Sequence, residues 1–171
     1  DGETGEVITK LAKSVFDANY ETFRYISSTS SWSPDGKYLT FAARAKGGDD
    51  LVIFDPKRRK AVRRIRVNLS GLASPVFSPD GKQLAFTGME GGISDLYVIN
   101  ADGTGLRQLT RDKYAQLMPA WSPDGHTIAY VTDEGPGTYF TELSYGNFRI
   151  ALFDLDLGRR ELLPHMDEGR N

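Results

Sequence analysis

Short runs of alternating apolar and polar residues recur along the chain and predict strands. The runs "KYLTF", "KQLAF" and "HTIAY" end at Phe41, Phe86 and Tyr130, so they are spaced by 45 and 44 residues. Each is followed by a more continuously apolar run, first "LVIFD", then "LYVIN" and "IALFD". Alternation with a period of two indicates a strand with one buried face, and helical periodicity does not appear between the runs.

A turn phrase precedes each alternating run. It reads "WSPDG" at 32–36, "FSPDG" at 77–81 and "WSPDG" at 121–125. Proline presets φ for the second position of a turn, Ser and Asp cap the local backbone, and glycine accepts a positive φ. The phrase therefore predicts three hairpins, and we expect the aromatic residue before each to wedge between neighbouring units. The turn residues are Pro34, Asp35, Gly36, Pro79, Asp80, Gly81, Pro123, Asp124 and Gly125.

The repeat predicts an all-β fold built from radially arranged blades. A period of 40–45 residues is typical of stacked supersecondary units, and four short antiparallel strands per unit are typical of a β-propeller. We expect blades at 28–67, 73–110 and 116–164, the last with an insert at 132–147. We also expect an outer strand of a preceding blade at 1–11, a long connection at 12–27, and a tail at 165–171 that leads to a missing blade.

The stretches "PAWSPDGHTIAYVTDEG" and "PVFSPDGKQLAFTG…DLYVINADGTGLRQLT" resemble the WD-like repeats of TolB-like propellers. The resemblance covers residues 28–164. It implies a six-bladed fold and a place in the bacterial cell envelope, periplasmic or extracellular. It also implies a protein partner, a peptidoglycan-associated lipoprotein. Fold alone does not fix function, because one fold serves many activities.

The number of blades raises the question of closure. Propellers close with four to eight blades, so three blades and one extra strand do not complete a ring. The chain is then a segment of a longer propeller, or several chains assemble to complete one. An open arc leaves an apolar blade face uncovered at each end, which favours such association.

The candidate partner-binding residues lie in loops of irregular length on one rim. The insert at 132–147 and the connection at 12–28 carry aromatic side chains among carboxylates, a composition that suits a protein interface. The alternative is that these rings pack back on the blades. The carboxylates would favour a basic partner. The residues are Tyr20, Phe23, Asp133, Glu134, Tyr139, Phe140, Glu142 and Tyr145.

Composition and charge narrow the function classes. The formal charge of −2 gives no general attraction to nucleic acid, and no apolar run is long enough to span a bilayer. The basic run at 57–66 is interpreted as a solvated sheet edge. The first ten residues do not resemble a signal peptide. The 171 residues include no cysteine, which excludes disulfides and thiolate chemistry.

Catalytic and metal-binding motifs are not evident. The chain has two histidines, His126 and His165, and neither a G-x-S-x-G nor an H-E-x-x-H motif. The acidic turns at 100–105 and 154–158 do not have the full ligand set of a calcium loop. The sequence therefore predicts a non-catalytic scaffold or protein-binding module without cofactor or metal. The alternative is the propeller part of a prolyl oligopeptidase-like hydrolase, which would gate a separate catalytic domain.

Overall fold

The computed structural model describes residues 3–4, 22–23, 29–45, 47–139 and 146–164, and every regular element in them is a β-strand. The strands are short, and tight turns or loops join most of them. They are β1 Thr22–Phe23, β2 Ser31–Trp32, β3 Leu39–Ala45, β4 Gly48–Asp55, β5 Lys60–Arg66, β6 Gly71–Phe77, β7 Gln83–Glu90, β8 Ile93–Asn100, β9 Arg107–Gln108, β10 Gln116–Trp121, β11 Thr127–Thr132, β12 Arg149–Asp154 and β13 Arg159–Leu162.

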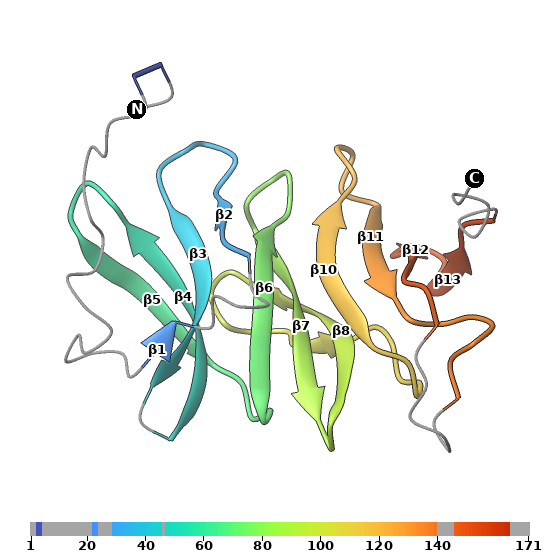
Figure 1. The fold of residues 1–171 in the computed structure, drawn as a ribbon. Coiled ribbons are helices and arrows are strands. Elements are labelled where there is room, and N and C mark those ends of the chain that lie inside the picture. Colours follow the sequence, from blue (N-terminus) through green and yellow to red (C-terminus); the bar gives the residue numbers. More distant parts are fainter. Residues whose placement is uncertain (1–2, 5–21, 24–28, 46, 140–145, 165–171) are drawn as a thin grey trace.

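The strands form three antiparallel sheets, which we call blades one, two and three. Blade one has the order β1-β3-β4-β5, with β2 also paired to β3; blade two has β6-β7-β8-β9 and blade three β10-β11-β12-β13. Figure 1 shows the blades side by side in an arc that stays open between blade one and blade three. The prediction of an all-β partial propeller is confirmed.

The inner strands of blades two and three change register near their middle. In β6 the shift falls between Ala73 and Val76, and in β10 between Leu117 and Ala120. A positive φ at Ser74 and at Met118 accompanies the two shifts. Such bulges bend a strand and let it follow a curved surface.

Blade one divides this inner strand into two pieces. The expected connection at 12–27 contains β1, whose residues Thr22 and Phe23 pair with Arg44 and Ala43 at one end of β3. At the other end of the same strand, β2 pairs with Leu39 and Thr40. The expected outer strand at 1–11 lies outside the described residues apart from 3–4, which form a turn, and the tail at 165–171 lies outside them.

The core lies between the blades. Between blades one and two, buried side chains of β3, β4 and β5 meet those of β6, β7 and β8, including Leu51, Ile53 and Phe86. Between blades two and three, Leu96 and Val98 pack with residues of β11 and β12. Burial of these apolar faces is the main favourable contribution to folding, so each blade depends on its neighbour.

Candidate functional site

The two rims of the arc differ in their connections. The turn rim carries the three SPDG turns, at 33–36, 78–81 and 122–125, which Figure 1 shows at the top of the view. The loop rim carries the β7–β8 hairpin, the long β11–β12 loop and the connections between blades. Loops on a rigid scaffold are common binding sites, so the loop rim is the candidate site.

Each SPDG turn is closed by its own serine and aspartate. In the first turn, Ser33 Oγ donates to Asp35 Oδ1 at 2.7 Å and accepts from Tyr38 N at 2.9 Å. Lys37 N donates to Asp35 Oδ1 at 3.1 Å. The other two turns repeat these contacts at the equivalent positions. The hydrogen bond from Ser33, followed by the contacts of Lys37, lowers the pKa of Asp35 to about 2.

The turns of successive blades stack on one another. Gly36, Gly81 and Gly125 have φ values of +67°, +72° and +77°, which favour glycine. A Cβ atom on Gly81 would lie 3.5 Å from Pro34 Cδ, and one on Gly125 would lie 3.7 Å from Pro79 Cδ. The proline of one turn therefore packs beside the glycine of the next. On the turn rim, the SPDG turns thus contact one another.

The aromatic residues before the turns differ in burial. Phe77 is buried in the core between blades one and two, and Trp121 is partly buried between blades two and three. The Trp121 indole donates from Nε1 to the carbonyl oxygen of Val76 in blade two, at 3.2 Å. Trp32 of blade one is 56% exposed. Phe77 and Trp121 thus lie between neighbouring blades as predicted, whereas Trp32 is mostly exposed.

On the loop rim, Asp133 holds the connection between blades two and three. Its side chain is 3% exposed, and its Oδ1 accepts from Ala115 N at 2.8 Å. Its carbonyl oxygen accepts from Thr138 Oγ1 at 2.6 Å, and that hydroxyl accepts from Gly146 N at 2.9 Å. Asp133 therefore fixes both ends of the described part of the β11–β12 loop and is not exposed for a partner.

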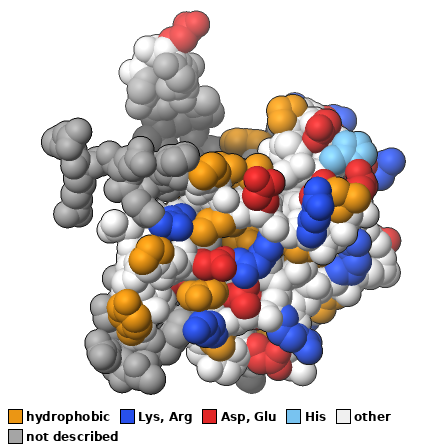
Figure 2. Space-filling view, turned by 90° about the vertical axis from the view of Figure 1, so that its right-hand side faces the viewer, with side chains coloured by type: hydrophobic (Ala, Val, Ile, Leu, Met, Phe, Trp, Pro, Cys, Tyr) orange, Lys and Arg blue, Asp and Glu red, His pale blue; other side chains and the backbone are white. Residues whose placement is uncertain are grey.

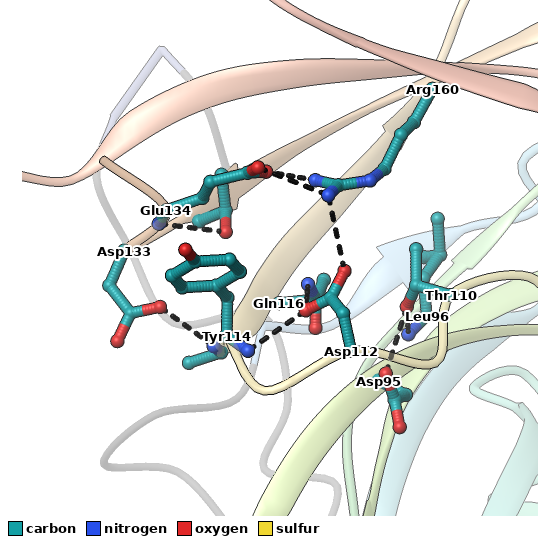
Figure 3. A network of polar contacts seen from close by, with 11 residues as sticks. Asp95, Leu96, Thr110, Asp112, Tyr114, Gln116, Asp133, Glu134 and Arg160 are labelled. Carbon is teal, nitrogen blue, oxygen red and sulfur yellow. Dashed lines mark hydrogen bonds and ion pairs between the residues drawn. The ribbon is translucent and has the colours of Figure 1, made fainter. Parts of the chain in front are cut away.

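Glu134 belongs to an ion-pair cluster with Arg160 and Asp112, which we call the rim network (Figure 3). Arg160 Nη1 and Nη2 contact the two oxygens of Glu134, the second pair at 3.0 Å, and Nη2 lies 3.7 Å from Asp112 Oδ2. Asp112 Oδ1 also accepts from Tyr114 N at 2.8 Å and from Gln116 Nε2 at 3.1 Å. The network joins the β11–β12 loop, strand β13 and the connection between the blades.

Electrostatics reinforce this arrangement. The carboxylate of Glu134 holds the pKa of Arg160 above its usual value, so the guanidinium stays charged. Burial raises the pKa of Tyr130, whose ring lies in the core between blades two and three, while Arg160 opposes that shift. The charge of Glu134 is therefore offset within the protein and does little to favour a basic partner.

Among the remaining expected partner-binding residues, Tyr139 is the one whose side chain the structure describes. It lies on the loop rim and is 58% exposed. The backbone of Phe23 lies in β1. The other four expected residues lie outside the described part of the chain: Tyr20, Phe140, Glu142 and Tyr145.

Sequence reasoning did not single out Asp112, Gln116 or Arg160. Asp112 lies in the connection before β10, Gln116 begins that strand, and Arg160 lies in β13. Their positions are separated from Glu134 by 18 to 26 residues in either direction, and no short motif links them. Only the folding of blade three brings them together.

Other candidate chemistry is accounted for by local contacts. In the basic run at 57–66, Arg58 pairs with Asp55, Arg66 pairs with Asp50, and Arg63 donates to a backbone carbonyl of blade two. Within the described residues, no group of three or more His, Cys, Asp or Glu side chains is arranged to hold a metal ion. The described residues also contain no helix long and apolar enough to cross a membrane.

Comparison with known sequences identifies relatives of the chain. The TolB beta propeller domain matches residues 17–157. A TolB homolog of Chlorobium luteolum is 32% identical over 144 residues, which cover 80% of this chain and 28% of that protein. A Tol-Pal system protein TolB of Anaeromyxobacter dehalogenans is 38% identical over 100 residues, 57% of this chain and 22% of that protein. The chain thus spans about a quarter of the length of these relatives.

A solved structure shows the same architecture. The crystal structure of TolB from Acinetobacter baumannii superposes with a TM-score of 0.63 at 28% identity, over 80% of this chain and 32% of that one. A shorter match, 39% identical over 41 residues, relates the chain to a dipeptidyl-peptidase 5 of Porphyromonas gingivalis. It covers 24% of this chain and 6% of that enzyme.

Proposed function

The chain belongs to the TolB beta-propeller family, and we propose that it is a non-catalytic, protein-binding part of a larger propeller in the bacterial cell envelope. The family match over residues 17–157 supports the class of protein. The name of the Anaeromyxobacter relative places that protein in the Tol-Pal system and supports an envelope partner. The partner implied by the resemblance is a peptidoglycan-associated lipoprotein, and the location is the periplasm.

The loop rim is the proposed binding surface, and the exposed ring of Tyr139 carries this proposal. An aromatic side chain that is 58% exposed on a tethered loop offers a large contact area with little ordering cost. Asp133 and Glu134 support the loop from within through Ala115 and Arg160. In this proposal the carboxylates position the loop, and the aromatic residue contacts the partner.

Titration calorimetry with the purified soluble domain of a peptidoglycan-associated lipoprotein tests the proposal. Tyr139→Ala, and likewise Phe140→Ala, is expected to weaken binding by about 1–2 kcal/mol, as is usual for an aromatic anchor. The matched control is Leu157→Ala. Leu157 is 61% exposed in the β12–β13 turn, on the turn rim, and its loss is expected to leave binding unchanged.

Two results would count against this assignment. Normal binding by Tyr139→Ala together with weakened binding by Leu157→Ala would place the interface on the turn rim. No binding by the unsubstituted chain, in a preparation with cooperative unfolding, would contradict a lipoprotein partner for this segment.

The second candidate function is the propeller part of a prolyl oligopeptidase-like hydrolase. The short match to a dipeptidyl-peptidase favours it. In that case the flanking coding sequence would contain a G-x-S-x-G nucleophile elbow, followed by an aspartate and a histidine. Determining that sequence separates the two proposals, because the nucleophile elbow is expected in the hydrolase and not in a non-catalytic TolB-like protein.

A further inference from the structure

We propose that the outer edge of blade one binds the anionic headgroups of a phospholipid bilayer. This surface, which we call the basic edge, consists of the β4–β5 turn residues 57–59 and of strand β5, Lys60–Arg66. The choice of phospholipid rests on the envelope location in the proposed function, whereas the affinity for phosphate rests on the edge itself. Figure 1 shows blade one and blade three at opposite ends of the arc, so the basic edge is separate from the loop that carries Tyr139.

Positive charge is concentrated on the basic edge. Residues 57–66 hold seven of the 21 lysines and arginines of the chain and none of its 23 aspartates and glutamates. The chain as a whole has a formal charge of −2, so the rest of the protein is acidic. At the blade-three end, which Figure 2 shows, basic and acidic side chains are interspersed. An anionic surface would therefore be attracted to one side of the protein. The seven cations are Lys57, Arg58, Arg59, Lys60, Arg63, Arg64 and Arg66.

All seven of these residues are exposed. Among the described strands β5 pairs with β4 alone, so it forms the outermost strand of its blade. Arg66 pairs with Asp50 and Arg58 with Asp55, yet the two arginine side chains remain 47% and 72% exposed. The neighbouring acids thus orient these cations without removing them from the surface.

The turn before β5 places an arginine where another blade has a glycine. Arg59 directly precedes the first residue of β5, and Gly158 directly precedes the first residue of β13. Their φ values are +53° and +62°, in the left-handed region that favours glycine. A long side chain in this conformation costs stability, and residues that break a local rule in this way are concentrated at functional sites.

Protection of a sheet edge does not explain the whole run. Lysine and arginine on an edge strand do hinder pairing with another chain, and so does a bulge. Strand β5 has both, because Val62 has no partner in its register with β4. The cations at 57–59, however, precede the strand and protect none of its backbone groups. They extend the positive charge beyond the edge that needs protection.

The composition and shape of the edge favour phosphate groups on a flat surface. Five of the seven cations are arginines, whose planar guanidinium groups pair with two phosphate oxygens at once. A strand of seven residues is about 23 Å long, so several cations can reach a bilayer together. Clusters of about four to eight basic residues are typical of binding to anionic lipids. Single-stranded nucleic acid fits less well, because residues 57–66 include no aromatic side chain on which a base could stack.

Co-sedimentation with vesicles tests the proposal. The probes are vesicles of phosphatidylcholine alone and vesicles that also contain phosphatidylglycerol, each mixed with the full chain. We expect the chain to bind the vesicles with phosphatidylglycerol and not the neutral ones. Raising the salt concentration from about 0.05 M to about 0.5 M should weaken binding by about tenfold or more, because salt screens charges at a surface.

A variant of the basic edge combines Lys57→Gln, Arg59→Gly and Lys60→Gln. It should bind the anionic vesicles about tenfold or more weakly, because each cation near an anionic bilayer contributes about fivefold to affinity. Arg59→Gly alone should weaken binding by about fivefold while its urea midpoint stays equal or rises, since glycine accepts the positive φ. A purely structural role of Arg59 would leave vesicle binding unchanged and would contradict the proposal.

The matched control removes the same charge elsewhere, through Arg107→Gln, Lys113→Gln and Arg159→Gln at exposed positions outside blade one. It should retain binding within about twofold. An equal loss in both triple variants would show that the basic edge is not the site. Equal binding of the unsubstituted chain to neutral and anionic vesicles would contradict recognition of anionic headgroups.

A DNA duplex of random sequence serves as the competing ligand. Binding of the duplex without binding of anionic vesicles would identify a polynucleotide as the partner and overturn our choice. The vesicles contain no protein, so the result is independent of the rim partner. Vesicle binding by a chain that does not bind the lipoprotein would contradict the rim partner alone, and the reverse result would contradict the basic edge alone.

Discussion

Gly88→Ala is expected to destabilise the protein, because the new methyl group has no space. A Cβ on Gly88 would lie 2.4 Å from Leu69 Cδ1 and 2.9 Å from Tyr97 Cε2. The Tyr97 ring cannot swing away easily, since it is 3% exposed and stacks on Phe86 with the ring centroids 5.5 Å apart. The side chain of Leu69 is partly buried against the same core and must give way as well.

The magnitude follows from two opposing terms. Overpacking a core costs about 1–3 kcal/mol. Replacing glycine by alanine at an ordinary backbone conformation returns about 0.4–1 kcal/mol, because the unfolded chain loses freedom. Gly88 has no positive φ, so strain adds nothing. The net loss of stability is then about 0.5–2 kcal/mol, which lowers the melting temperature by about 2–4 °C per kcal/mol in a chain of this size.

Urea denaturation followed by circular dichroism measures this loss, and a double mutant identifies its cause. Leu69→Ala removes the atom closest to the new methyl, so Gly88→Ala should cost less in that background than in the wild type. The coupling isolates the clash from other effects of either substitution. A Gly88→Ala midpoint equal to or above the wild-type value, or strict additivity with Leu69→Ala, would refute the reasoning.

Three further predictions concern the turns and the rim network. Gly81→Val should lower stability by about 1–3 kcal/mol in urea denaturation, because a β-branched residue is strained at a φ of +72°. Arg160→Met should lower the free energy of unfolding by about 1 kcal/mol and speed proteolysis of the β11–β12 loop, because Glu134 loses its partner. Arg159→Met, at the neighbouring exposed position, should change neither the stability nor the rate of proteolysis. The pKa values of the three turn aspartates are lowered by hydrogen bonds from the serine and the backbone of the same turn. They contribute stability that is fully present above the unfolded pKa of about 4 and is lost as the pH falls below it. The acid limb of a melting-temperature profile should therefore flatten in the variant with asparagine at Asp35, Asp80 and Asp124.

The fold was predictable because its determinants are local and repeated. The SPDG turn depends on a proline, a capping side chain and a glycine within five residues, and this group occurs three times in the chain. The alternation that follows each turn marks the strand itself, and in β11 buried and half-buried residues do alternate. In β7 both faces are buried, because blade two lies between its two neighbours. The split of the first inner strand into β1 and β2 was not predictable, because the residues between them do not follow the repeat.

The glycine at position 88 is visible in the sequence, but the reason for it becomes clear only from the structure. At the equivalent positions, blade one has Ala43 and blade three has Thr132, so the backbone there tolerates a side chain. Blade two differs in placing the large ring of Tyr97 on the neighbouring strand, where the other blades have valine or alanine. The absence of a Cβ at Gly88 leaves room for the Tyr97 ring, because a close-packed core has no spare volume. Such compensation between residues on neighbouring strands is not predictable from a single sequence.

The candidate site was predictable only in part, because an exposed and a tethered carboxylate look alike in a sequence. Asp133 and Glu134 occur among aromatic residues, as they would in a binding loop, yet their partners are Ala115 and Arg160, on other elements. These contacts mean that the two acids hold the loop in place, while Tyr139 of the same loop stays exposed on the candidate site. A loop that is anchored at its base by buried and paired carboxylates loses less conformational entropy on binding than a free loop does. In our proposal, the network that offsets the charge of the acids would therefore also favour recognition through the exposed ring of Tyr139.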